Sequence, residues 1–159
     1  MTNMKETAND TFLSNKEKRL GILLWFHVSR FFNHSIRRSN NHLKEWNLSA
    51  AQFDILAQVG SNKRLTQKEL GNKLLVTKGN IAQLLAKMEK MNIIQREREW
   101  KTKYLSLTEQ GKELYQEVVP RQETFQASQF CNLNREEQHQ LLELLKKLHQ
   151  NPDHKEETT

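Results

Sequence analysis

The 159-residue chain has the composition of a helix-rich globular protein, with 36% hydrophobic and 28% charged residues, five Gly and two Pro. This length suffices for one domain with a buried core, and the composition favours helices over a β-sandwich or a disordered chain. The most apolar run, residues 20–26, is too short to span a bilayer, and the first ten residues lack a signal-peptide pattern. We therefore expect a cytoplasmic protein without a membrane segment.

Cysteine and histidine content limits redox and metal chemistry. Cys131 is the one cysteine, which excludes an internal disulfide and a cysteine-based zinc site. With no basic neighbour closer than Arg135 to activate it, we expect a small buried apolar residue rather than a redox sensor. His27, His34 and His42 fall near one face of a predicted helix, which leaves histidine-bound zinc as an alternative; we expect no metal or other cofactor.

Positive charge is concentrated in the middle of the chain. The whole sequence has a net charge of +6. Residues 61–104 contain eleven Lys and Arg against four Glu, a net charge of +7, whereas residues 105–159 have a net charge of −4. A basic centre between less basic ends is typical of a region that binds a polyanion.

In chain order, residues 1–15 are polar and aperiodic, and we expect a frayed end. A long helix is predicted over residues 16–46, because apolar and aromatic residues recur there every three or four positions. A short break at residues 47–48 precedes a second helix that ends at Gly60. The sequence tetrads after Ser49, Thr66 and Asn134 resemble capping boxes, and Thr77 and Thr108 are candidate N-caps.

The remaining elements complete a mainly helical fold with a small β-hairpin. Helices are predicted over residues 66–74 and 77–91, strands over 93–98 and 102–107, and helices from 108 and over 136–149. The predicted order is α-α-α-α-β-β-α-α, followed by a frayed tail at residues 151–159.

A helix-turn-helix is predicted between residues 67 and 84. Gly71 supplies a small residue where two helices would cross, and apolar residues follow at spacings that lock the second helix against the first. An ordinary αα-hairpin is the alternative interpretation. The basic β-hairpin that follows favours a winged helix-turn-helix, because basic residues on such a wing can reach phosphates or the minor groove.

The stretch LTQKELGNKLLVTKGNIAQLLAKMEKMNIIQRE, followed by LSLTEQGKELYQEVVP, closely resembles the MarR family of transcriptional regulators. The resemblance covers residues 16–150. It implies a winged helix-turn-helix lobe at about residues 49–108 and dimerisation helices at about residues 16–46 and 109–150. It also implies a sequence-specific DNA-binding regulator, a repressor released by a small amphipathic or aromatic ligand. We find no phosphate-binding loop, nucleophile elbow or HExxH group, and expect no enzyme activity.

The second helix of the motif is expected to enter the major groove, because its first half contains side chains that can contact bases. Asn80 and Gln83 can each make bidentate contacts to adenine, and Lys78 can reach guanine or a phosphate. The preceding helix start and the wing are expected to hold the phosphate backbone. The full set of predicted DNA-binding residues is Thr66, Gln67, Thr77, Lys78, Gly79, Asn80, Gln83, Lys87, Arg96, Arg98, Lys101 and Lys103.

The wing departs from the family at its tip. The positions that usually hold an Asp-Arg-Arg group are occupied by Glu99, Trp100 and Lys101, and the preceding segment is about three residues shorter. The basic character of the tip is kept only at Lys101, and the sequence leaves open whether this shorter wing enters the minor groove.

The predicted partners are a second copy of the chain, double-stranded DNA with a pseudo-palindromic operator, and a small-molecule effector. The resemblance implies an effector cavity for which the candidate lining is Phe31, Phe32, His34, Arg38, Phe53 and Tyr115. A winged-helix protein-interaction module without DNA binding, and a thiol- or metal-responsive regulator of the same fold, remain alternative functions.

Overall fold

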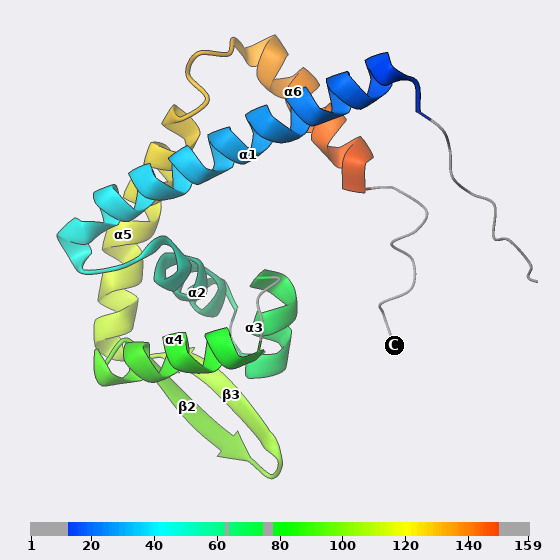
Figure 1. Cartoon of the computed structure of the whole chain (residues 1–159). Coiled ribbons are helices and arrows are strands. Elements are labelled where there is room, and N and C mark those ends of the chain that lie inside the picture. The colour runs from blue at the N-terminus through cyan, green and yellow to red at the C-terminus, as the bar shows by residue number, and fades with distance from the viewer. Residues whose placement is uncertain (1–12, 63, 75–77, 150–159) are drawn as a thin grey trace, which may run out of the picture. The chain divides into compact units, whose positions relative to one another are not determined.

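The computed structural model describes residues 13–62, 64–74 and 78–149, without the side chain of Lys78. Figure 1 shows helices throughout except for a small sheet. In chain order the elements are α1 (Asn15–Leu43), the 3-10 turn η1 (Lys44–Trp46), α2 (Ala50–Ser61), β1 (Leu65–Thr66), α3 (Gln67–Leu74), α4 (Lys78–Lys90), β2 (Ile94–Glu99), β3 (Thr102–Leu107), α5 (Glu109–Ser128) and α6 (Arg135–His149).

The chain divides into two compact units, residues 1–37 and residues 38–159. The first contains most of α1, which begins where the Ser14 amide donates to Glu17 Oε2 at 2.7 Å. Its large apolar side chains are exposed in this single chain; Ile22 is 67% exposed and Trp25 is 75% exposed. Among the described helices, none combines the length and hydropathy needed to cross a membrane.

The second unit is built around α2, which contributes more residues to the core than any other described element of the unit. Helices α3, α4 and α5 and strand β3 all contact α2. Burial at every third or fourth position explains why these segments form amphipathic helices around one apolar centre. The buried core residues are Leu43, Leu48, Ala50, Phe53, Ile55, Leu56, Val59, Leu65, Leu70, Ile81, Leu85, Met88, Ile93, Ile94, Leu105, Leu107, Val118 and Val119.

The wing is a three-stranded antiparallel sheet in the order β1-β3-β2, so the predicted two-stranded hairpin was incomplete. The added strand pairs Leu65 with Leu105 and Thr66 with Tyr104. Periodicity does not reveal a strand of two residues, because alternation needs about four residues to be recognised. β1 joins the base of the wing directly to the start of α3.

Side-chain caps define the helix starts as predicted. Ser49 forms a complete capping box with Gln52. Thr66 accepts from the Glu69 amide at 3.1 Å, and Glu69 Oε2 accepts from the Thr66 amide at 2.8 Å. The Asn134 amide likewise donates to Glu137 at 2.8 Å, so three sequence tetrads fix three helix starts. Thr77, the remaining candidate cap besides Thr108, lies outside the described residues.

Three sequence expectations were wrong. The first helix ends at Leu43 rather than residue 46, because η1 tightens the chain and Asn47 then takes a left-handed conformation with φ 55°. A Cβ on Gly71 would meet no described atom within 4 Å, so close helix crossing does not explain this glycine. Cys131 is exposed rather than buried, because it lies in the turn between α5 and α6.

Gly111 and Thr108 close the base of the wing. Thr108 accepts from the Gly111 amide at 2.9 Å, and the Thr108 amide donates to the Ile93 carbonyl at 3.1 Å. A Cβ on Gly111 would overlap that same Ile93 carbonyl oxygen. The LT-x-x-G sequence therefore lets α5 begin directly against the first residue of the wing.

Gly111→Ala is expected to lower the free energy of unfolding by about 1–3 kcal/mol, because a backbone oxygen must move to admit the methyl group. Gly71→Ala is the matched control and should raise it by about 0.5–1 kcal/mol, since alanine favours a helix interior. Chemical denaturation of the purified proteins measures both. Equal effects of the two substitutions would contradict the role assigned to Gly111.

Candidate nucleic-acid interface

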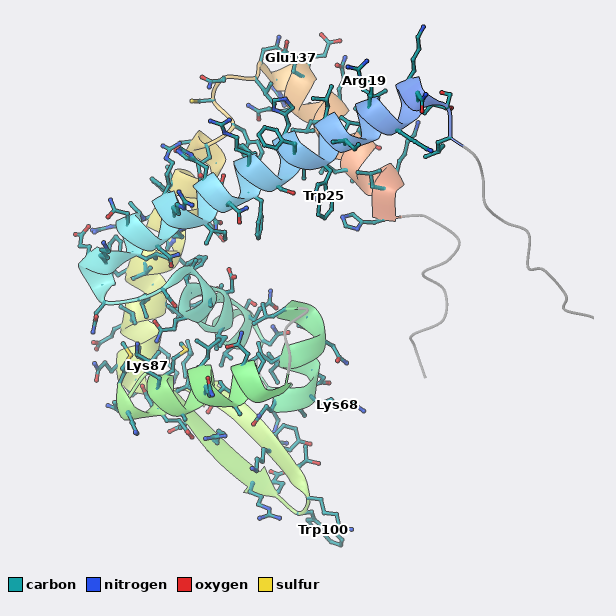
Figure 2. All side chains as sticks on the ribbon, in the orientation of Figure 1. Arg19, Trp25, Lys68, Lys87, Trp100 and Glu137 are labelled. Carbon is teal, nitrogen blue, oxygen red and sulfur yellow. The ribbon has the colours of Figure 1, made fainter. Side chains whose placement is uncertain are left out.

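Helix α4 has one buried and one exposed face. Ile81, Leu85 and Met88 are at most 1% exposed and anchor the helix to the core. Gln83 and Lys87 lie on the opposite face and are exposed, as Figure 2 shows for Lys87. The spacing of three and four residues keeps polar side chains on one side of the helix.

The first turn of α4 is exposed and contains a glycine. Gly79 is exposed, and a Cβ there would meet no described atom within 4 Å. Asn80 is also exposed at the start of the helix. The backbone can therefore approach another molecule closely at this end. Thr77 and the side chain of Lys78, both predicted to contact DNA, lie outside what the structure describes.

The start of α3 is held by its own side chains. The Thr66 hydroxyl donates to Glu69 Oε2 at 2.8 Å, in addition to accepting from the Glu69 amide. The hydrogen bonds that the Thr66 amide and then its hydroxyl donate to the carboxylate lower the pKa of Glu69. The hydroxyl is thus used within the capping box, and a phosphate contact by Thr66 stays a prediction.

Basic and acidic side chains of the wing lie on opposite faces of the hairpin. Arg96 pairs in register with Leu105, and Arg98 with Lys103, so these four side chains share one face. Glu97 and the other intervening acid of β2, Glu99, fall on the opposite face because strand residues alternate. Arg98 and Lys103 are exposed near the outer end of the basic face.

Arg96 ties this basic face to α4 and α3. Its Nε donates to Glu89 Oε1 at 2.7 Å, its Nη2 bonds the second carboxylate oxygen, and its Nη1 reaches Gln67 Oε1 at 3.5 Å. The side chains of Arg96 and Glu89 are 26% and 29% exposed. The guanidinium assigned to DNA phosphate by sequence is thus occupied within the protein in this state, and its DNA contact stays a prediction.

The tip of the wing carries an exposed aromatic ring between cationic residues. Trp100 is 96% exposed and lies at the far end of the hairpin from the helices, as Figure 2 shows. Arg98 Nε donates to the Trp100 carbonyl oxygen at 3.1 Å. Lys101 is exposed in the same turn.

Arg64 is a wing residue that the sequence analysis did not select. Its guanidinium lies 3.7 Å from the centroid of the Tyr104 ring and pairs with Glu99. Both contacts are on the acidic face of the hairpin, where Arg64 offsets a carboxylate. Arg64 directly precedes β1, and a strand of two residues gives no periodic signal by which the sequence could have identified Arg64.

The candidate effector residues lie in different surroundings. Phe31, Phe32 and His34 are exposed within the first unit. In the second unit, Phe53 is buried in the core and Tyr115 packs over Gly60, where a Cβ would overlap the ring. The Arg38 guanidinium lies 5.6 Å from the centroid of the Phe125 ring.

His42, one of the three histidines considered for zinc, has other partners. Its Nδ1 lies 2.7 Å from Gln122 Oε1, and its ring stacks on Phe125 with centroids 4.3 Å apart. Within the described part of the chain, no group of three or more His, Cys, Asp or Glu residues is placed to hold a metal ion.

Known proteins that resemble the chain share this arrangement of helices and wing. The MarR family profile matches residues 46–99, from η1 through β2. An uncharacterized HTH-type transcriptional regulator from Bacillus cereus (strain ATCC 10987) is 43% identical over 142 residues, covering 89% of this chain and 97% of the relative. The chain belongs to the MarR family of winged helix-turn-helix transcriptional regulators. This regulator is therefore a DNA-binding protein and not an enzyme.

Solved structures share the fold at lower identity. A MarR-family regulator from Listeria monocytogenes, crystallised with a 26mer DNA, is 24% identical with a TM-score of 0.71, covering 80% of this chain and 87% of that one. Bordetella bronchiseptica BpsR, whose DNA binding is regulated by 6-hydroxynicotinic acid, is 18% identical with a TM-score of 0.71, covering 79% and 91%.

Glu89→Gln is expected to destabilise the regulator by about 1–2 kcal/mol at pH 7, because it removes charge-assisted hydrogen bonds to a partly buried arginine. Those hydrogen bonds from Arg96 hold the pKa of Glu89 below its ordinary value of 4.5. A depressed carboxylate pKa stabilises the folded state above the unfolded pKa, and this contribution is lost as the pH falls through the folded pKa. The difference between wild type and variant should therefore shrink below about pH 4.5.

Denaturant unfolding at a series of pH values measures this difference. Glu143→Gln is the control, since its pair with Lys146 on α6 is exposed and should contribute less than about 0.5 kcal/mol at any pH. A constant difference between wild type and Glu89→Gln down to pH 3 would contradict the assigned pair.

Proposed function

We propose that this regulator reads a pseudo-palindromic operator as a homodimer, with α4 of each subunit in the major groove. The observation that carries the proposal is the exposed polar face of α4, opposite the buried residues that fix the helix to the core. An α-helix fits the major groove, where each base pair presents a distinct set of donors and acceptors. The Listeria regulator crystallised with DNA supports the same partner for this fold.

Contacts to DNA bases and contacts to the DNA phosphate backbone are assigned to different residues. The amides of Asn80 and Gln83 match the donor and acceptor pair that adenine shows in the major groove. Lys87, one turn further along α4, is exposed and is assigned to a phosphate. Arg98 and Lys103, paired in register on the basic face of the wing, are assigned to the flanking backbone.

A homodimer is supported by apolar surface that the single chain leaves open. In the first unit, the large apolar residues of α1 are exposed around the helix. In the second unit, Leu144 and Leu148 of α6 are 60% and 68% exposed. Monomers rarely leave this much apolar surface uncovered, and one recognition helix contacts too few base pairs to define an operator. A second copy would cover the apolar surface and supply the second recognition helix.

We propose repression relieved by a small amphipathic or aromatic ligand. A dimer bound over a promoter blocks access to it, and 6-hydroxynicotinic acid provides the chemical precedent in BpsR. Arg38 above Phe125 offers a cation next to a ring, which suits an aromatic carboxylate. A hollow of about 440 Å³ beside Trp46 is lined by Glu113 and Glu117 and suits such an anion less well.

Comparison of Gln83→Ala with Lys103→Ala should distinguish contacts to bases from contacts to the phosphate backbone. Loss of a bidentate base contact should cost about 1–3 kcal/mol on the operator and little on scrambled DNA. Loss of a phosphate contact should weaken both duplexes alike and reduce the salt slope by about one. The measurement is equilibrium binding across a salt series, on a duplex that the wild-type protein selects from random-sequence DNA.

Each variant first needs the melting temperature of the wild type, so that misfolding is not mistaken for a lost contact. If Gln83→Ala weakens operator and scrambled DNA equally, α4 is only a basic surface and the assignment of sequence reading to it is wrong.

A further inference from the structure

Trp100 combines two features that are explained neither by the fold nor by the role proposed for α4. It is the most exposed of the large apolar residues in the described chain, at 96%. It also has a φ of 55°, in the left-handed region. Trp100 and Lys101 form the two-residue turn between β2 and β3, a place where glycine or asparagine adopts positive φ at low cost. A tryptophan here costs conformational energy and buries no surface within the chain.

The turn holds the ring outward in a cationic setting. Arg98 Nε is bonded to the Trp100 carbonyl oxygen, which fixes the backbone of the tip. Lys101 follows directly, and Lys103 lies opposite Arg98 on the basic face. Glu99, the nearest acid, is paired with Arg64. Two cationic residues, Arg98 and Lys101, thus flank Trp100 in the chain, and the intervening carboxylate already has a cationic partner.

The wing is also fixed relative to α4. The bonds from Arg96 to Glu89 and Gln67 join β2 to both helices of the motif. The basic face of the hairpin begins at this junction with α4 and continues through Arg98 and Lys103 toward the tip. A polyanion bound at α4 would therefore meet further positive charge along the hairpin.

We propose that Trp100 is a DNA-contact residue, which places its indole ring in the minor groove beside the segment that α4 occupies. This inference rests on the proposed entry of α4 into the major groove. A narrow groove with strong negative potential suits a flat ring flanked by Arg98 and Lys101, and apolar wedges are a known means of minor-groove binding. The indole N–H donates to the N3 of adenine or the O2 of thymine, whereas the exocyclic amine of guanine obstructs the ring.

The proposal predicts a distinctive salt signature. An uncharged ring displaces no counterions, so Trp100→Asn should weaken binding about tenfold without changing the salt slope. Lys101→Gln, next in the chain, should instead reduce the slope by about one. Asparagine tolerates positive φ, so Trp100→Asn should leave the melting temperature unchanged or raise it. Replacing A·T pairs by G·C in the flanks should weaken the wild type but not Trp100→Asn.

Trp100 fluorescence provides a test that does not depend on affinity. Trp25→Phe and Trp46→Phe together leave Trp100 as the sole tryptophan, and acrylamide quenching is measured with and without the selected duplex. We expect free Trp100 to be fully quenchable and DNA-bound Trp100 to be protected. If the double variant does not fold, the difference in quenching between wild type and Trp100→Asn gives the same information.

The outcomes distinguish this inference from the proposed function. Binding of the wild type with full quenching of bound Trp100, or equal affinity of Trp100→Asn, overturns the inference and leaves the proposed function standing. Protection of Trp100 without DNA as protein concentration rises would identify a second copy as the occupant and also overturn it. Protection by DNA, with no operator-specific loss in Gln83→Ala, supports the inference and contradicts the proposed role of α4.

Discussion

The bidentate pair between Glu89 and Arg96 ties the wing to the helix-turn-helix. Glu89 lies near the end of α4, and Arg96 is the third residue of β2. Gln67, at the start of α3, accepts a third hydrogen bond from Arg96. These three residues connect both helices of the motif to the wing. Without this connection, the hairpin would be held to the helices by the pairing of β1 with β3 and by the buried residues at its base. The charge pair therefore helps to fix the wing relative to α4.

Local signals in the sequence predicted most of the fold. The capping tetrads at Ser49, Thr66 and Asn134 begin helices within one residue of the predicted positions, because a cap requires only neighbouring residues. Features that depend on distant residues were missed. The two-residue strand β1 exists only through its pairing with β3, and the exposure of Cys131 follows from a turn between two helices.

The sequence predicted which residue types make up the candidate site, but not which other residues of the chain they contact. Gln83 and Lys87 were selected because they are polar residues on the helix that the resemblance predicts to enter the major groove, and both are exposed. Arg96 was selected by charge alone, and no pattern in the sequence reveals that Glu89 occupies its guanidinium. Trp100 looked like a departure from a family pattern. Its meaning depends on exposure and backbone conformation, which only the structure provides.

The central claim is that two copies of α4 read one operator, and hydroxyl-radical footprinting of the complex with the selected duplex tests it most directly. The account predicts two protected half-sites related by a pseudo-twofold axis, with centres about 10 base pairs or a multiple of that apart. Protection of a single half-site at saturating protein, or uniform protection without boundaries, would contradict it.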